Sequence, residues 1–376
     1  MPRLLEKRLA PADSLWAISW TTALAVVAAL GVGGLLFLPF GSNPLDAYIA
    51  LFAEGFSSWR GFGYTLVKAA PLILIGLGTI VAWRTGFGYL GFEGCLLVGA
   101  AAATWVALET AAGGLFGPLP WPLFLTLVIL VTIVAGGIWA GIVGIFRGWF
   151  GGNEVITSLM MNYLAVFLVQ YLVSGPLRAS GDLPQSPRLP RETWLPYFLE
   201  GTRAHSGIFI ALVAALIIWV VLLRSRIGYE LIVTGLNPKA ARFGGINVGS
   251  RQVLAAFIAG GLGALAGMVE VLGVHHRLLD GLSEGTGFIG IVAALLGKLH
   301  PLGVLIASTL YAGMTVGADA MQRQAGLPSS IIFIVQSLIV LFVLASDLLR
   351  YYTLHLPFGR RRGAASSLKT DLPGET

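Results

Sequence analysis

The sequence has 376 residues, of which 56% are hydrophobic and 11% are charged, with a formal net charge of +6. Its hydrophobic share exceeds the roughly 45–50% that is typical of soluble domains, which excludes an ordinary soluble enzyme. A single cysteine excludes a disulfide framework and a cysteine-based metal cluster. Because charge asymmetry across a membrane accounts for the excess of Lys and Arg, we expect no nucleic-acid partner.

Hydrophobic stretches long enough to cross a bilayer recur along the chain, since about 17–25 apolar residues span the hydrocarbon core as a helix. We therefore predict an all-α polytopic protein in a lipid bilayer, with about ten transmembrane helical elements. Glycines four residues apart predict close helix packing at Gly137/Gly141, Gly144/Gly148 and Gly263/Gly267. The continuous spans are expected near residues 18–40, 65–82, 89–108, 121–146, 155–174, 207–223, 252–274 and 331–349.

Two further apolar segments, 286–296 and 302–316, are separated by the sequence GKLHP. Both are shorter than an ordinary span. Interruptions by Gly and Pro are typical of half-helices or broken helices, which are tolerated at membrane depth only where they face protein or a water-filled cavity. The fold is therefore expected to include broken or short helices.

The distribution of Lys and Arg predicts the topology. If both short segments cross, the two termini share one side, and placing that side in the cytoplasm puts most of the 24 Lys and Arg residues there. We therefore expect a plasma-membrane protein with both termini cytoplasmic. Its expected parts are a cytoplasmic segment (1–17), a transmembrane domain (18–349) with an extracytoplasmic loop (175–206) and a cytoplasmic loop (224–251), and a cytoplasmic, disordered tail (350–376).

Two motifs match enzyme signatures but occur in the wrong context. GFGYLG (86–91) matches a dinucleotide-binding pattern and GLSEG (281–285) matches a nucleophile elbow, yet both patterns require an adjoining strand. The sequence has no GxxxxGK[ST] phosphate loop, and the adjacent His275 and His276 cannot share a metal as an i, i+4 pair would. We therefore predict no catalytic residue, no metal site and no enzymatic activity in this chain.

Charged and amide side chains at membrane depth are costly, so those that occur there are candidates for a solute pathway. For Asn153 and Glu154 the alternative is a cap at a helix N-terminus, and for Glu270 it is a side chain that reaches the outer interface. Glu93 lies in a glycine-rich entry to a span and is the leading candidate. The full set of candidates is Glu93, Asn153, Glu154, Asn162 and Glu270.

The stretch GLNPKAARFG (235–244) is polar and cationic within a hydrophobic chain. Asn237 and Pro238 predict the start of a helix, with Asn as the N-cap and Pro in the first turn. Gly244 predicts its end. The sequence therefore predicts a short, capped helix on the cytoplasmic side.

The side chains of this short helix allow two interpretations. The small Ala240 and Ala241 would let the helix seat closely in the cleft of a partner, and Lys239 and Arg242 could pair with acidic groups there. Alternatively, the segment is an ordinary cationic loop beside anionic lipids. The residues alone leave both interpretations open.

Four stretches resemble the permease subunits of ABC importers: GFGYLGFEGCLLVGA, GGNEVITSLMMNYLAVFLVQYLVSGPLR, GLNPKAARFGGINV and GKLHPLGVLIASTLYAGMTVGADAMQR. The resemblance runs in order from Ala70 to Asp347 and is to the branched-chain amino acid and simple-sugar superfamily, specifically its nucleoside-type permeases. It implies an ABC importer permease fold and three kinds of partner. These are two ABC ATPase subunits, a second permease that is identical or different, and an extracytoplasmic solute-binding protein or lipoprotein.

The resemblance also implies roles for particular residues. The segment that contains Asn237 would dock on the ATPase, and no cofactor is expected in this chain because ATP and Mg²⁺ would be bound by the ATPase subunits. In many relatives an Asn and a Gln stand where this chain has Tyr89 and Cys95, so solute contacts at those positions would differ here. The implied docking residues are Gly235, Asn237, Pro238, Ala240, Ala241, Arg242 and Gly244.

The expected function is therefore that of a permease subunit of an ATP-driven importer for nucleosides, which moves solute by alternating access. A permease for ribose or another simple sugar is the first alternative. An ion-coupled secondary transporter, in which Glu93, Glu154 or Glu270 binds protons or sodium, is the second. An intramembrane enzyme is disfavoured by the missing catalytic constellation.

Overall fold

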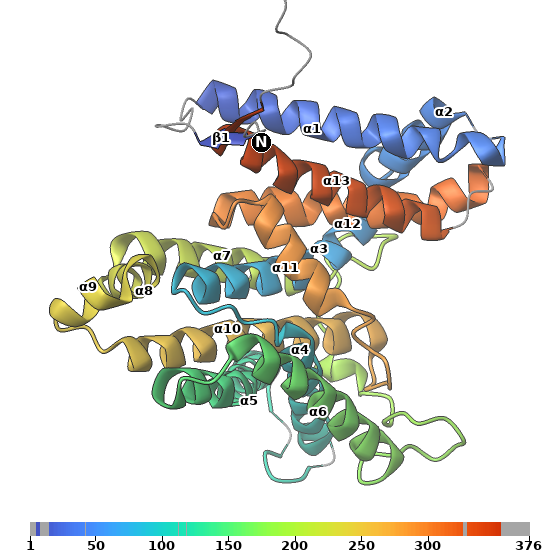
Figure 1. The fold of residues 1–376 in the computed structure, drawn as a ribbon. Coiled ribbons are helices and arrows are strands. Elements are labelled where there is room, and N and C mark those ends of the chain that lie inside the picture. Colours follow the sequence, from blue (N-terminus) through green and yellow to red (C-terminus); the bar gives the residue numbers. More distant parts are fainter. Residues whose placement is uncertain are drawn as a thin grey trace, which may run out of the picture.

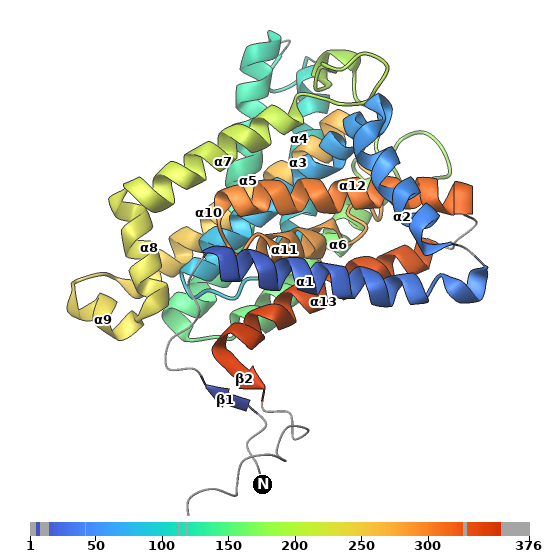
Figure 2. The same cartoon turned by 90° about the horizontal axis from the view of Figure 1, so that it is seen from above.

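The computed structural model describes residues 5–7, 15–41, 43–111, 113–117, 119–325 and 329–354, and helices dominate this part of the chain (Figures 1 and 2). The strands β1 (Leu5–Lys7) and β2 (Tyr352–Leu354) pair antiparallel and bring the two ends of the described chain together. The helices are α1 (Leu15–Leu35), α2 (Pro44–Phe52), α3 (Trp59–Arg84), α4 (Phe92–Ala111), α5 (Trp121–Phe150), α6 (Glu154–Ser174), α7 (Gly207–Arg224), α8 (Arg226–Leu236), α9 (Pro238–Phe243), α10 (Val248–Glu270), α11 (Thr286–Leu296), α12 (Pro301–Ala325) and α13 (Ser329–Tyr351).

Seven helices among the described residues are long and apolar enough to cross a membrane. They are α3, α4, α5, α6, α7, α10 with the π-helical turn that continues it to His275, and α12 as far as Arg323. Each predicted continuous span overlaps a helix, and α11 has only 11 residues, as expected of a short element. The prediction of an all-α polytopic membrane protein is confirmed.

The structure corrects the expectation for the segment 302–316. The helix there is α12, which runs for 25 residues from Pro301 to Ala325 and is not a short element. The hydrophobic run ends near Val316, but good helix formers such as Ala, Met, Gln and Arg follow Gly317 and continue the helix. Hydropathy therefore marked the apolar part of this helix and missed its polar end.

The first predicted span, 18–40, is also divided differently in the structure. Helix α1 ends at Leu35, and a 3₁₀ turn at Leu38–Phe40 contains Pro39, which cannot continue a helix. Next comes α2, which no sequence argument anticipated. Its signal was present, because Asn43 accepts a hydrogen bond from the Leu45 N–H and Pro44 is the first helical residue.

The helices pack around two hydrophobic cores. The main core surrounds α10, which contacts α3, α4 and α5 and is buried along most of its length. The second core joins α1, α2, α12 and α13, which form a layer along one side of the molecule in Figure 1. The loop that contains α8 and α9 (residues 224–251), called the α8–α9 loop below, lies at one end of the helices. The connection between α6 and α7 lies at the opposite end (Figure 1).

Glycine gives α5 and α10 their close contact. A β-carbon at Gly148 would lie 2.8 Å from the carbonyl oxygen of Gly249, and one at Gly144 would lie 2.8 Å from the β-carbon of Ala256. Larger residues would therefore force the helices apart. The predicted packing role is confirmed for these two glycines but is wrong for Gly141, where a β-carbon would meet no atom within 4 Å.

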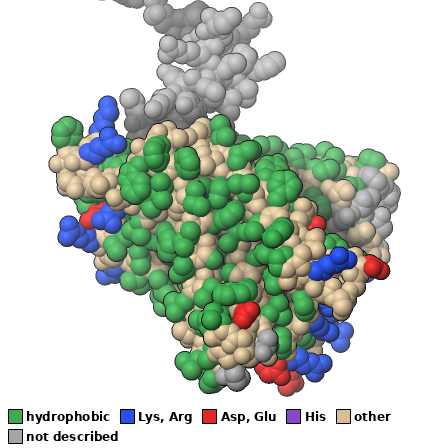
Figure 3. Space-filling view, turned by 90° about the horizontal axis from the view of Figure 1, so that it is seen from below, with side chains coloured by type: hydrophobic (Ala, Val, Ile, Leu, Met, Phe, Trp, Pro, Cys, Tyr) green, Lys and Arg blue, Asp and Glu red, His purple; other side chains and the backbone are tan. Residues whose placement is uncertain are grey.

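The outer surface fits a membrane environment. Viewed from below, hydrophobic side chains cover the middle of the molecule, and most Lys, Arg, Asp and Glu side chains lie toward its edges (Figure 3). The predicted disordered tail falls mainly on residues 355–376, which lie outside the described residues. The predicted division into segments otherwise remains a prediction.

Candidate functional site

The α8–α9 loop is built by local hydrogen bonds. The Asn237 side chain accepts hydrogen bonds of 3.1 Å from the N–H groups of both Lys239 and Ala240, which caps α9 as the sequence predicts. At the other end of α9, the Gly244 N–H donates to Ala240 and the Ile246 N–H donates to Ala241. The result is a short helix that stands apart at one end of the molecule (Figure 2).

The two alanines of α9 face in different directions. Ala240 is exposed, whereas Ala241 is 1% exposed and packs inside the loop. The expectation that both alanines seat in a partner's cleft is therefore wrong for Ala241, because one face of a two-turn helix must cover the structure beneath it. The sequence could not show which face this was.

Two exposed hydrophobic residues flank the capped helix and were missed by the sequence argument. Leu236 is 80% exposed and Phe243 is 95% exposed, and they lie immediately before and at the end of the segment Asn237–Phe243. Exposed large apolar side chains on a projecting loop indicate a contact surface. Lys239 and Arg242 are exposed on the same helix, so the surface is both cationic and hydrophobic.

Ion pairs tie this loop to the rest of the structure. The buried carboxylate of Glu230, on α8, lies 3.0 Å from the Arg226 Nε and 2.6 Å from an Arg251 guanidinium nitrogen on α10. A carboxylate with two cationic partners fixes the position of α8 against α10. Gly235 also matters, because its backbone lies directly against the carbonyl oxygen of Arg84 at the end of α3.

The structure places three of the candidate pathway residues on or before one helix, α6. Asn153 caps α6, since its side chain accepts from the N–H groups of Val155 and Ile156, in agreement with the capping alternative. Glu154, in the first turn, pairs with Arg147 at 3.3 Å. Asn162 lies two turns further along α6 and is buried.

Glu154, Ser158 and Asn162 are spaced four residues apart and line one face of α6. They bind the non-helical segment that joins α3 to α4. The Gly88 N–H donates to Glu154 at 3.3 Å, and the Leu90 N–H donates to Ser158 at 3.2 Å. These side chains therefore supply partners for backbone groups that a helix would have satisfied internally.

Asn162 makes the most buried of these contacts. Its Oδ1 accepts a hydrogen bond of 2.8 Å from the Gly94 N–H, and its Nδ2 donates to the Leu90 carbonyl at 3.0 Å. Both polar atoms of the amide are thus engaged with backbone. In this structure Asn162 supports the entry to α4.

Glu93 joins the start of α4 to the start of α11. Its Oε1 accepts a hydrogen bond of 2.9 Å from the Gly285 N–H, and its Oε2 accepts one of 2.8 Å from the Gly287 N–H. A carboxylate at a helix N-terminus is stabilised by the free N–H groups and the helix dipole. Glu93, the leading pathway candidate, therefore caps the N-terminus of the short helix α11.

Glu270 lies on α10 among other charged groups. It is buried, with one carboxylate oxygen 3.6 Å from the His275 Nε2. Lys68 and Glu284 lie close enough to exert electrostatic effects on Glu270 and His275. The expectation that Glu270 reaches the outer interface does not fit this burial, although Lys68 on α3 and Glu284 in the connection before α11 are exposed beside it.

Tyr89 and Cys95, where this chain departs from the pattern of the permeases that it resembles, are in contact with each other. The Tyr89 hydroxyl lies 2.9 Å from the Cys95 sulfur, and both side chains are fully buried. The Tyr89 ring also packs on Phe87 and Phe92. The pair therefore fills the core between the non-helical segment and α4.

At the opposite end from α9, two histidines lie in the connections outside the helices. The His276 ring stacks on Trp194 with centroids 3.6 Å apart, and its Nε2 lies 3.0 Å from the Tyr197 hydroxyl. Burial lowers the pKa of His276 to about 4, with repulsion from Arg188 as the next cause. Burial also lowers the pKa of His205 to about 4, so both imidazoles are neutral at pH 7.

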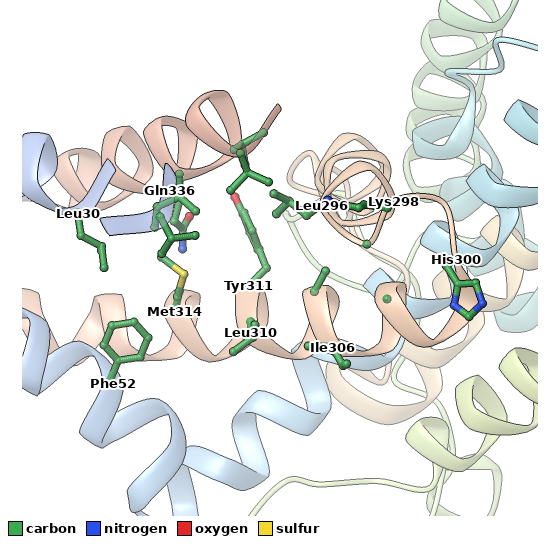
Figure 4. A pocket seen from close by; sticks show the side chains of 17 residues that line it. Leu30, Phe52, Leu296, Lys298, His300, Ile306, Leu310, Tyr311, Met314 and Gln336 are labelled. Carbon is green, nitrogen blue, oxygen red and sulfur yellow. The ribbon is translucent and has the colours of Figure 1, made fainter. Parts of the chain in front are cut away.

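A cavity of about 570 Å³ lies between the α1 and α13 pair and the α11 and α12 pair (Figure 4). Its lining is predominantly hydrophobic, with Leu310 and Met314 of α12 among the lining residues and with Lys298 and His300 after α11. Burying a polar solute where few hydrogen-bond partners exist is costly. The cavity is also separate from Glu93 and Asn162, so we do not assign the solute pathway to it.

These features define a class of protein. The chain is a multi-pass helical membrane protein with a projecting helix at one end. Polar residues on α6 bind the non-helical segment between α3 and α4. Residues 61–347 match the family described as the permease component of branched-chain amino acid transport systems. The chain belongs to this family of permeases, and a permease component implies further subunits of a transport system.

Several characterised relatives are similar over most of their length. The glucose ABC transporter permease TsgB13 of Haloferax volcanii is 33% identical over 96% of this chain and 95% of its own. The guanosine ABC transporter permease NupP of Bacillus subtilis is 35% identical over 87% of this chain and 93% of its own. The nucleoside ABC transporter permease NupB of Lactococcus lactis is 30% identical over 85% of this chain and 89% of its own. No solved structure matches the chain.

Proposed function

We propose that the chain is the transmembrane permease of an ATP-driven importer whose solute is a nucleoside. The similarity to the guanosine permease over 87% of the chain supports this proposal most directly. Two ATPase subunits would bind ATP and Mg²⁺, a second permease would complete the membrane core, and an extracytoplasmic binding protein would deliver the nucleoside. The permease itself would then move solute by alternating access without its own ATPase site.

The proposed ATPase-docking surface is α9 with its flanks. Lys239, Ala240 and Arg242 are exposed there, and Leu236 and Phe243 add the apolar contacts that a stable docking site needs. Asn237 and Pro238 start the helix and Gly244 ends it, while Gly235 and Ala241 hold it against the permease. We propose that this end faces the cytoplasm, together with the chain termini that β1 and β2 bring side by side.

A sugar is the second candidate solute. The glucose permease is similar over more of this chain than the guanosine permease is, 96% against 87%. The guanosine permease is slightly more identical to it, at 35% against 33%. Both solute classes carry several hydroxyl groups. The polar residues around Glu270 would suit either class, so a direct test has to decide.

Uptake by the reconstituted complex tests the proposal. The permease, its ATPase and its binding protein are placed in proteoliposomes, and uptake of radiolabelled guanosine, uridine, glucose and ribose is measured with and without ATP. ATP-dependent uptake of the nucleosides supports the proposal. Uptake of glucose alone supports the alternative, and uptake that collapses with an ionophore but persists without ATP overturns the importer assignment.

A further inference from the structure

The segment Thr85–Gly91, between α3 and α4, is not helical, and its side chains at Thr85, Phe87 and Tyr89 are buried while Gly86 is exposed. Phe87 and Tyr89 are fully buried, and the α6 side chains described above bind its backbone. Non-helical backbone at membrane depth needs such partners. The segment is thus a non-helical connection with defined contacts at both ends.

At its first end, the backbone of the segment lies against the backbone of Gly235 near the end of α8. Gly86 has a positive φ of 71°, and a β-carbon there would lie 3.2 Å from the Gly235 Cα. Conversely, a β-carbon on Gly235 would overlap the Arg84 carbonyl oxygen and lie 2.8 Å from the Gly86 nitrogen. Gly235 precedes α9 by only three positions, so this contact connects the projecting helix directly to the segment.

The second end of the segment reaches α11. Gly91 leads directly into α4, where the Glu93 carboxylate binds the N–H groups of Gly285 and Gly287. Gly287 packs closely as well, because a β-carbon there would lie 2.6 Å from the Glu93 Cα. A shift of the start of α4 therefore has to move α11 or break two hydrogen bonds.

The loop at the first end is stiff enough to transmit a displacement. Glu230 holds α8 to α10 through Arg251 at 2.6 Å, and the Asn237 cap and the bond from Ile246 to Ala241 close α9. Contacts made between backbone atoms have no flexible side chain to absorb movement, and close-packed interiors transmit strain. A push on α9 therefore acts on Gly86 through Gly235.

We propose that the segment Thr85–Gly91 mechanically links the α8–α9 loop to the N-terminus of α11, with Gly86 and Ser158 as positioning residues. This link rests on the proposed function, because it assumes that a partner ATPase displaces α9. Movement of α9 would shift the segment along the α6 face and carry Glu93 with it. The short helix α11 would then tilt or slide, and access to the polar site near Glu270 would change.

Hydrogen exchange tests this mechanical link independently of solute transport. In the complex with ATPase and binding protein, exchange of residues 85–95 is compared between the nucleotide-free state and a state trapped with a non-hydrolysable ATP analogue. We expect exchange in 85–95 and in 285–290 to change together with exchange in α9. A change in α9 without any change in 85–95 would overturn the link.

Substitutions then test whether the link matters for transport. Gly86→Ala places a β-carbon against Gly235 at a positive φ, and we expect it to lower the ratio of solute transported to ATP hydrolysed by about tenfold, within the range of coupling between distant sites. Ser158→Ala removes the partner of the Leu90 N–H without adding bulk, and provides a milder version if Gly86→Ala fails to fold. Both variants should lose the exchange response of 85–95.

Gly141→Ala is the matched control, since a β-carbon there meets no atom within 4 Å. It should leave both the transport ratio and the exchange response unchanged. A normal ratio in Gly86→Ala and Ser158→Ala, with ATP-driven uptake in the wild type, would overturn the link alone. Absence of ATP-driven uptake in the wild type would instead overturn the proposed function.

Discussion

The α8–α9 loop and the Thr85–Gly91 segment both interrupt helices, but they satisfy their backbone groups differently. In the loop, Asn237 binds the N–H groups of Lys239 and Ala240, its near neighbours in the chain. In the segment, the N–H groups of Phe87 and Tyr89 also bond to nearby carbonyls, but the backbone groups of Gly88 and Leu90 are bound by α6 side chains 66 to 72 positions away. The capped turn of the exposed loop thus finds its backbone partners locally, whereas the buried segment needs tertiary partners as well.

This difference predicts unequal sensitivity to substitution. At the surface, water replaces a lost hydrogen bond, so the loss is small. In the buried segment, a donor or acceptor without its partner keeps the full cost of desolvation. Substitutions along α6 should therefore destabilise the protein more than substitutions in α9.

The largest effect is expected for Asn162→Leu. The substitution leaves the Gly94 N–H and the Leu90 carbonyl without partners in a buried position. We expect the free energy of unfolding to fall by about 2–4 kcal/mol, from two unsatisfied groups. Thermal unfolding of the detergent-solubilised protein, followed by tryptophan fluorescence, measures this change. A melting temperature equal to that of the wild type would show that the contact is dispensable.

A second comparison uses the two alanines of α9. Ala241→Glu forces a carboxylate into the interior of the loop and should open it, at a cost of about 1–3 kcal/mol. Ala240→Glu, on the exposed side, should leave the loop intact but weaken ATPase binding by placing a negative charge on a cationic surface. Hydrogen exchange of residues 238–246 and co-purification with the ATPase separate the two outcomes. Equal loop exchange in both variants would contradict the inward orientation of Ala241.

The pH dependence of stability tests the opposite end of the molecule. His205 and His276 have a pKa of about 4 in the folded protein against an ordinary value of 6.5, so the unfolded chain binds more protons between these values. Their contribution to stability is therefore complete above pH 6.5 and is lost as the pH falls toward 4. Melting temperatures measured from pH 7.5 to 4 should decline over that window. His276→Gln should flatten the decline, and an unchanged profile would contradict the assignment to His276.

The smallest effect is expected for Asn237→Ala. It removes the cap of α9 at an exposed position and should cost about 1 kcal/mol of local helix stability. Exchange of the α9 amides should accelerate while the global melting temperature stays close to that of the wild type. Asn237→Ser, which keeps a capping oxygen, should restore most of the protection. A global destabilisation as large as that of Asn162→Leu would remove the distinction between local and tertiary support.

Sequence patterns predicted a helix well where its hydropathy and its capping residues lie in one continuous stretch. The spans overlap helices, and the Asn-Pro start and Gly end of α9 appear as expected. The same Asn-Pro signal at Asn43 and Pro44 marks the start of α2. Hydropathy did not predict this helix because a long hydrophobic run precedes it. The polar end of α12 was missed for a related reason, since hydropathy measures burial in lipid and not helix length.

The roles of the polar residues could not be predicted in the same way. The sequence singles out Glu93 and Asn162 as polar residues in apolar stretches, but their partners are backbone groups at the start of α11, in the first turn of α4 and on the segment before it. The residues near Glu93 and Asn162 in the sequence do not predict which distant backbone groups they bind.

The sequence by itself determined that this is a polytopic helical membrane protein with a short, capped, cationic helix at one position, because hydropathy and capping depend on neighbouring residues. Only the tertiary structure decided that Ala241 faces inward, that Glu93 caps α11, and that Gly235 lies against Gly86. These contacts join residues far apart in the chain. They exist because packed helices bring distant backbone groups within hydrogen-bonding distance, where water is absent and each group needs a partner.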